Sequence, residues 1–289
     1  MVACVMLIVL SPTIGQLCQP VFHASSHPLT ANRFRGNNTV DRINNLRLGE
    51  RFMKIVILGA GQAALQTALS LRQGNFDGDI DIVGNERFLP YQRPPLSKAY
   101  LKGALDRERL FLKPQEFFDA QNITVRLTQQ VTAIDRQAQR ISGDNGFALD
   151  YDKLVLATGS RPRRLDLPGR DLENIFDLRD MADVDAMAGQ FQAGKKLVII
   201  GGGYIGLEAA SVARAMGLEV TILEARPRLL ARVAEPEISE FYAQLHQSHG
   251  VEIITQCQIA GFQGSQHVTA VDFADGSSLA ADLVITGIG

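Results

Sequence analysis

The stretch Lys54-Ile55-Val56-Ile57-Leu58-Gly59-Ala60-Gly61-Gln62-Ala63-Ala64 decides the fold. Its apolar run predicts a buried strand at 54–58, and the small and apolar residues that follow predict a helix over 62–72. A strand that turns sharply into a helix leaves unpaired N–H groups at the helix start, where a pyrophosphate can bind. Glycines allow the tight turn and a close approach of the backbone to phosphate. The stretch therefore predicts a dinucleotide-binding unit.

The pattern recurs farther along the chain. Lys196-Leu197-Val198-Ile199-Ile200 leads directly into Gly201-Gly202-Gly203-Tyr204-Ile205-Gly206, and a helix is expected over 204–216. One such motif is weak, because a glycine after a strand is common. Two of them, each between a predicted strand and a predicted helix, indicate two dinucleotides bound at once, as in a flavin reduced by a nicotinamide. The fold class is α/β, with two Rossmann-like dinucleotide-binding domains.

The rest of the chain alternates strands and helices in the same way. We expect the first domain to begin at residue 53 and run to 162, and the second to cover 163–286. Further strands are expected at 79–83, 153–157, 219–223, 251–254 and 281–286, and helices at 181–192 and 236–248. An apolar strand that runs into Gly287-Ile288-Gly289 indicates that these last residues begin a return to the first domain, which is then incomplete.

Residues 1–52 do not share this pattern. Val2 to Leu10 is apolar but too short to span a bilayer, and no Lys or Arg precedes it, so the positive region of a signal peptide is missing. We interpret this stretch as a disordered leader or a mis-assigned start before Met53, with a targeting segment as the alternative.

The composition limits the possible partners. The 289 residues are 46% apolar and 21% charged with a net charge of −2, which favours two ordinary domains and indicates neither nucleic acid nor an anionic membrane as partner. Cys4, Cys18 and Cys257 have no CxxC spacing and the five histidines are dispersed, so we expect no metal site. Few cysteines fit a cytoplasmic protein.

Polar residues after two predicted strands are candidates for ribose binding. Asn85 and Glu86 follow the strand at 79–83, and Glu224 follows the strand at 219–223. A carboxylate there accepts hydrogen bonds from a free 2′-hydroxyl and repels a 2′-phosphate, so Glu224 favours NADH. Arg226 and Arg228 nearby leave NADPH open.

Charged residues near strand ends are further candidates. Arg93 and Lys98 flank a rigid Pro-Pro turn and could balance pyrophosphate or reduced-flavin charge, whereas Arg163 and Arg164 fit a solvated surface better. Glu208 lies early in the second helix, where it could reach a nicotinamide carboxamide or serve only the helix dipole.

Four motifs together carry a resemblance to a known family. They are PYQRPPLSK at 90–98, YDKLVLATGSRP at 151–162, GGGYIGLE at 201–208 and LLARV at 229–233. From about Lys54 to Gly289 the chain resembles the FAD-dependent NADH:ferredoxin and rubredoxin reductases, whose chains continue well beyond this length. The resemblance implies electron transfer from NADH through FAD to a [2Fe–2S] ferredoxin or a rubredoxin that serves an oxygenase or P450.

The resemblance also implies roles for single residues. The first dinucleotide would be FAD, with contacts from Gly59, Gly61, Ala63, Asn85, Glu86, Arg93, Lys98, Val131, Thr158, Gly159 and Arg179. The second would be NADH, with contacts from Gly201, Gly203, Ile205, Gly206, Glu208, Glu224 and Arg232. The family usually has Asp where this chain has Asn85. No side chain acts as acid or base; Lys98 would stabilise the flavin and Glu208 would position the nicotinamide.

Three alternatives compete with this interpretation. Flavin disulfide reductases and peroxidases need a cysteine near the flavin, and no cysteine lies between Cys18 and Cys257. A cysteine-free NADH oxidase, or a reductase resembling apoptosis-inducing factor, stays open. So does a non-catalytic fragment that binds NADH without retaining FAD.

Overall fold

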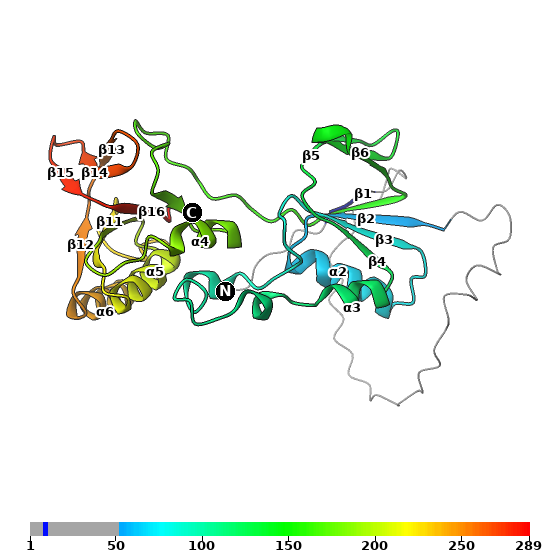
Figure 1. Ribbon diagram of the computed structural model, residues 1–289, viewed down its shortest axis with the longest axis horizontal. Helices are drawn as coiled ribbons and strands as arrows, with labels where there is room; N and C mark the ends of the chain where they lie inside the picture. The colour runs from blue at the N-terminus through cyan, green and yellow to red at the C-terminus, as the bar shows by residue number, and fades with distance from the viewer. Residues whose placement is uncertain (1–7, 11–51) are drawn as a thin grey trace, which may run out of the picture. The chain divides into compact units, whose positions relative to one another are not determined.

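The computed structural model describes residues 8–10 and 52–289. They form two units, of which one ends at Pro90 and resumes over Lys113–Gly159, and the other comprises Tyr91–Leu112 and Ser160–Gly289. Figure 1 shows that each unit has a central β-sheet with helices packed beside it. Apart from Ile8–Leu10 and Phe52, the predicted leader lies outside the described residues.

The sheet of the first unit has the strand order β1-β8-β2-β3-β4. Strands β2 (Lys54–Leu58), β3 (Asp79–Val83), β4 (Ile123–Arg126) and β8 (Lys153–Leu156) are parallel, and β1 (Ile8–Leu10) pairs antiparallel with β8. Leu58 pairs with both Val83 and Leu156, which brings the carboxyl ends of β2, β3 and β8 to one edge. Helices α2 (Gln62–Gln73) and α3 (Gln115–Ala120) pack on this sheet.

A small antiparallel sheet completes the core of the first unit. It consists of β5 (Val131–Asp135), β6 (Arg140–Gly143) and β7 (Ala148–Asp150), with the 3-10 turn η3 (Asp144–Gly146) between the last two. Ile141 and Tyr151 are buried against Val56 and Leu154 of the parallel sheet, so the two sheets share one apolar core.

The sheet of the second unit is parallel throughout, with the order β12-β11-β10-β16-β9. Its strands are β9 (Ile175–Asp177), β10 (Lys196–Ile200), β11 (Glu219–Glu224), β12 (Val251–Thr255) and β16 (Leu283–Thr286). Its helices are α4 (Met181–Ala188), α5 (Tyr204–Ala215) and α6 (Pro236–Ser248). A second, antiparallel sheet contains β13 (Ile259–Gly264), β14 (Val268–Phe273) and β15 (Ser278–Ala280). The chain leaves β10 toward β11 on one side while β16 lies on the other, so the strand order reverses at β10, the place where sheets of this kind bind ligands.

The segment Tyr91–Leu112 groups with the second unit, although its place in the sequence put it within a first domain of 53–162. It contains the 3-10 turns η1 (Pro94–Ser97) and η2 (Arg107–Leu110). The Tyr100 hydroxyl donates to Asp185 of α4 at 2.6 Å, and Arg107 pairs with the same carboxylate at 2.9 Å. These long-range side-chain contacts explain why a boundary drawn from sequence order differs from the structural one.

Most predicted elements have the observed bounds to within one residue. The strands at 54–58, 79–83 and 196–200 and the helix at 236–248 are confirmed to the residue. The helix predicted over 181–192 ends earlier, at Ala188, with Gly189 as its C-cap. Strand β9 was not predicted, since three residues are too few to show a period. Within residues 52–289 no helix is both long and apolar enough to cross a bilayer.

Candidate dinucleotide sites

The first glycine turn joins β2 to α2. Gly59 has a φ of +113°, and its N–H donates to the Val83 carbonyl at 2.7 Å. A Cβ at Gly59 would lie 2.1 Å from the carbonyl oxygen of Ala157, so only glycine fits. At Gly61, by contrast, a Cβ would meet no atom within 4 Å. The turn is therefore crowded behind its first glycine and open in front of its second.

The start of α2 is suited to an anion. Gly61 is the N-cap, no side chain caps the helix, and its first turn has no acidic residue. The first backbone bond of the helix runs from Leu65 N to Gly61 O at 3.1 Å. The N–H groups before Leu65 have no acceptor within the helix, and the helix dipole places partial positive charge there. A pyrophosphate fits these donors.

The second turn repeats this geometry between β10 and α5. Gly201 has a φ of +112°, its N–H donates to the Leu223 carbonyl at 2.8 Å, and a Cβ there would lie 2.5 Å from the Gly287 carbonyl oxygen. Gly203 is the N-cap of α5, and a Cβ there would meet no atom within 4 Å. No side chain caps α5, and its first turn contains no acidic residue. Tyr204 and Ile205 are exposed in that first turn.

Glu224 lies directly beside the second turn. One oxygen of its carboxylate accepts from Gly202 N at 2.8 Å, and the other accepts from Arg226 N at 2.9 Å. Arg228 Nη1 donates to the Ala234 carbonyl at 2.7 Å and to the Ser239 hydroxyl of α6 at 2.6 Å, so the guanidinium is held by these contacts. Of the two arginines expected as possible partners of a 2′-phosphate, Arg228 thus makes side-chain contacts within the protein, and Arg226 contributes its backbone N–H to Glu224.

Lys98 and Glu208 form an ion pair in the second unit. Lys98 Nζ lies 2.7 Å from Glu208 Oε2, and the buried Ser97 hydroxyl donates to the same oxygen at 2.5 Å. Lys98 and Glu208 are half-exposed, a setting in which an ion pair adds about 0–1 kcal/mol to stability. The main effect of the ion pair is therefore to fix the position of the Lys98 ammonium group. The contact of Ser97 with Glu208 could not be predicted from the sequence, because the two residues are 111 positions apart.

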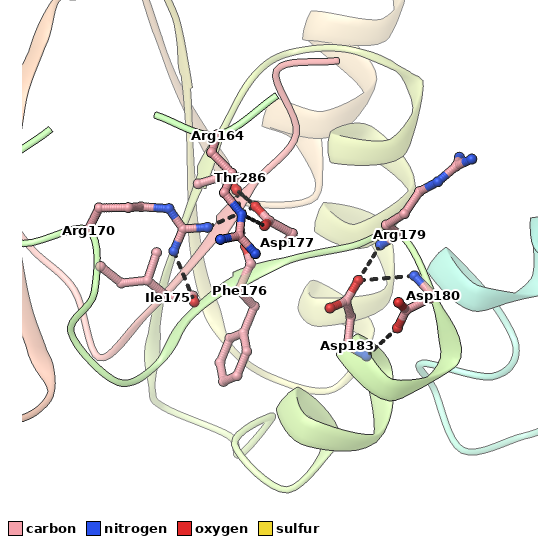
Figure 2. Close-up of polar contacts among 9 residues, drawn as sticks. All are labelled: Arg164, Arg170, Ile175, Phe176, Asp177, Arg179, Asp180, Asp183 and Thr286. Carbon is pink, nitrogen blue, oxygen red and sulfur yellow. Dashed lines mark hydrogen bonds and ion pairs between the residues drawn. The ribbon is translucent and has the colours of Figure 1, made fainter. Parts of the chain in front are cut away.

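Arg93 and Arg179 meet at the start of α4. Arg93 Nη1 donates to the Arg179 carbonyl at 2.9 Å, and its guanidinium lies 5.1 Å from the centroid of the Tyr91 ring. Arg179 N and Asp180 N both donate to Asp183, which closes a capping box, and Figure 2 shows the Arg179 side chain directed away from that box. Burial raises the pKa of the Asp183 carboxyl. Arg93 thus holds its loop to α4 and is no freely solvated cation.

The remaining predicted residues lie at strand ends. Asn85, exposed, and Glu86, half-buried, follow β3, while Thr158 and Gly159 follow β8. These positions share the edge of the first sheet that carries Gly59. Val131 begins β5 and packs on the apolar core of the first unit. In the second unit, Arg232 donates to the Ile288 carbonyl at 3.1 Å, just beyond β16.

Comparison with known proteins identifies the family. The family model described as pyridine nucleotide-disulphide oxidoreductase matches residues 53–289. The chain belongs to this family. It is 45% identical to putidaredoxin reductase of Pseudomonas putida, over 81% of this chain and 57% of that protein. It is 41% identical to rhodocoxin reductase of Rhodococcus erythropolis, over 82% of this chain and 56% of that protein.

Solved structures give the same family. The covalent putidaredoxin reductase–putidaredoxin complex matches with a TM-score of 0.80 and 44% identity, over 83% of this chain and 59% of that one. The ferredoxin reductase for the CYP199A2 system from Rhodopseudomonas palustris matches with a TM-score of 0.78 and 40% identity, over 82% of this chain and 58% of that one. The chain thus spans slightly more than half the length of these relatives.

Membership of the pyridine nucleotide-disulphide oxidoreductase family implies FAD and NAD(H) as cofactors, and the residues present fit both. Each turn has open space where phosphate would approach and an uncapped helix start behind it. The family's name implies a redox disulfide, but Cys257 is a free thiol and the sole cysteine of residues 52–289. Burial raises its pKa, so it stays protonated and unreactive near neutral pH. No group of acidic, histidine and cysteine side chains in the described part could hold a metal ion.

Proposed function

We propose that this protein is a flavoprotein reductase that passes electrons from NADH through FAD to a small iron–sulfur protein, a [2Fe–2S] ferredoxin or a rubredoxin. The observation that carries this proposal is the pair of matching glycine turns, both open at the second glycine and both followed by an uncapped helix. The similarity to reductases named for putidaredoxin and rhodocoxin supports the acceptor class. An oxygenase or P450 would be the final user of the electrons, in the cytoplasm.

The chain's own residues would bind and orient rather than react. Bound together, FAD and NADH supply hydride transfer, and FAD can then release electrons one at a time. The N–H groups at the starts of α2 and α5 would hold one pyrophosphate each. Glu208, which accepts a hydrogen bond from Ser97, would hold Lys98, whose positive charge would stabilise the reduced flavin. Glu86 and Glu224 would each accept hydrogen bonds from a ribose hydroxyl.

NADH rather than NADPH is the electron donor in this proposal. The Glu224 carboxylate would repel a 2′-phosphate, and Arg228 is held by the Ala234 carbonyl and the Ser239 hydroxyl. The backbone N–H of Arg226 donates to Glu224, which helps to hold the carboxylate that would accept from a free ribose hydroxyl.

An anaerobic visible spectrum tests the proposal. The chain is purified in excess FAD, gel-filtered and mixed with NADH. We expect a retained yellow chromophore that NADH bleaches and that a [2Fe–2S] ferredoxin or a rubredoxin reoxidises. Retained flavin that NADH does not bleach would overturn the proposal, and a colourless protein that binds NADH would support the fragment alternative.

Two matched variants assign the sites. Gly61→Ala and Gly203→Ala each place a methyl in open space at ordinary φ, so neither should destabilise the fold. The methyl would occupy the place where phosphate approaches, and we expect each to weaken its own ligand about tenfold, FAD for Gly61→Ala and NADH for Gly203→Ala. If both variants weaken the same ligand, the assignment of the two turns is wrong.

A further inference from the structure

Strands β9 and β16 end in a buried polar pair that the proposed function does not use. Thr286 is 4% exposed, and the Asp177 side chain is 9% exposed. The Thr286 hydroxyl donates to the Asp177 carboxylate and lies 3.3 Å from the Phe176 carbonyl oxygen (Figure 2). A buried hydroxyl and a buried carboxylate cost free energy unless they are paired, so this contact fastens two neighbouring strand ends together.

Two arginines also contact the Asp177 carboxylate, and Arg170 shares Oδ1 with the Thr286 hydroxyl. Arg170 donates to Asp177 Oδ1 at 2.9 Å and to the Ile175 carbonyl at 3.3 Å. Arg164 Nε lies 3.6 Å from Asp177 Oδ2, and Figure 2 shows the three side chains gathered around Thr286. The Arg170 bond is charge-assisted and therefore stronger than a neutral one, so it helps to fix Asp177 as the acceptor of the Thr286 hydroxyl.

The residue that follows β16, Gly287, packs against the second glycine turn. Gly287 N donates to the Ile200 carbonyl at 2.7 Å, which continues the pairing with β10. The Gly287 carbonyl oxygen lies so close to Gly201 that a Cβ there would approach it to 2.5 Å. A shift of Gly287 would therefore move or open the turn that receives phosphate.

The strand order decides which half of a dinucleotide would be affected. Glu224 ends β11 on one side of β10, and a carboxylate at that place binds the adenosine ribose. The other half of a bound dinucleotide would extend past β10 toward β16. We propose that Thr286, held by Asp177, is a positioning residue that sets the end of β16 for the nicotinamide half of NADH. This inference rests on the proposed function.

Two probes test it on the whole chain, NADH followed by its own fluorescence and AMP followed by competition. Thr286→Val keeps the shape and removes the hydroxyl, and we expect NADH to bind about 5- to 10-fold more weakly because the end of β16 is no longer fixed to Asp177. AMP, which has no nicotinamide half, should bind as in the wild type. Thr286→Ser, which keeps the hydroxyl, should restore NADH binding.

Thr221→Val is the control for the loss of a hydroxyl–carboxylate bond at an exposed place in the same sheet. Thr221 is on β11 of the same sheet and donates to Glu252 at 3.1 Å, so the variant also loses a hydroxyl–carboxylate bond. We expect its NADH affinity to be unchanged. The inference is overturned if Thr286→Val binds NADH normally, if it weakens AMP equally, or if Thr221→Val has the same effect. A wild-type chain that binds no NADH would overturn the proposed function first, and this inference with it.

Discussion

The two glycine turns have nearly the same backbone but different side chains behind it. Gly59 and Gly201 have φ values of +113° and +112°, and each donates its N–H to the neighbouring strand, at 2.7 Å and 2.8 Å. Each also lies against a carbonyl oxygen of the strand end on its other side. In both turns a side chain at the first glycine would clash with a backbone carbonyl oxygen next to the sheet. The requirement for glycine therefore does not depend on which ligand the turn binds.

The turns differ at the fifth residue after the first glycine. Ala64 occupies it in α2 and is fully buried. Gly206 occupies it in α5, where a Cβ would lie 2.3 Å from the Gly201 carbonyl oxygen. Both residues suit the motif, but the second turn has no room for a methyl. The choice between Gly and Ala therefore follows from how closely the helix packs on the turn.

The turns also differ in the acidic residue beside them. Leu58 pairs with Val83, and Ile200 pairs with Leu223, so Gly84 stands at the place that Glu224 has in the second unit. A Cβ at Gly84 would lie 2.4 Å from the Ala60 Cβ, so a side chain does not fit there. A ribose ligand in the first unit must come from farther along, and Glu86 is the carboxylate that our sequence prediction places there.

The largest expected effect concerns the feature that the turns share. Gly59→Ala and Gly201→Ala each add a methyl at positive φ against a backbone carbonyl. We expect each to lower the free energy of unfolding by about 2–5 kcal/mol, the sum of backbone strain and overpacking. Urea unfolding measures this. A loss below about 1 kcal/mol for one variant alone would break the equivalence of the turns.

A smaller effect should separate the two carboxylates. Glu224→Gln removes the charge beside the second turn, and we expect the preference for NADH over NADPH to fall about tenfold because like-charge repulsion is lost. Glu86→Gln makes the same change in the first unit and should leave that preference unchanged. The ratio of the two dissociation constants is the measurement. An unchanged ratio in Glu224→Gln would mean that this carboxylate serves only to hold Gly202 and Arg226.

The smallest effect concerns the helices α6 and α3, which precede the third strands β12 and β4. His246 of α6 is buried five residues before β12, where α3 has the fully buried Phe118. Burial, and then His249, lowers the pKa of His246, so the unfolded chain binds more protons. Stability from this group is present above about pH 6.5 and is lost as the pH falls below it.

His246→Phe, which copies the first unit, should flatten this part of the pH dependence. Urea midpoints between about pH 7.5 and about pH 5.5 measure it. The reciprocal change Phe118→His should introduce the same acid sensitivity into the first unit. Equal slopes in His246→Phe and the wild type would show that another group is responsible.

The sequence by itself determined the fold class and the two turns. It also determined, to within one residue, the bounds of most of the strands and helices that it predicted. These follow from local rules, because an apolar run and a glycine turn act on neighbouring residues. The family was also accessible from four short motifs, and the match over 53–289 confirms it.

Tertiary structure alone decided which distant residues meet. Ser97 reaches Glu208, Tyr100 reaches Asp185, and Thr286 reaches Asp177, and no spacing in the chain predicts these pairs. It also decided that Arg228 is occupied and that Tyr91–Leu112 groups with the second unit. The physical reason is that hydrogen bonds and crowding between separate elements depend on strand order and register, which emerge only when the sheet is assembled.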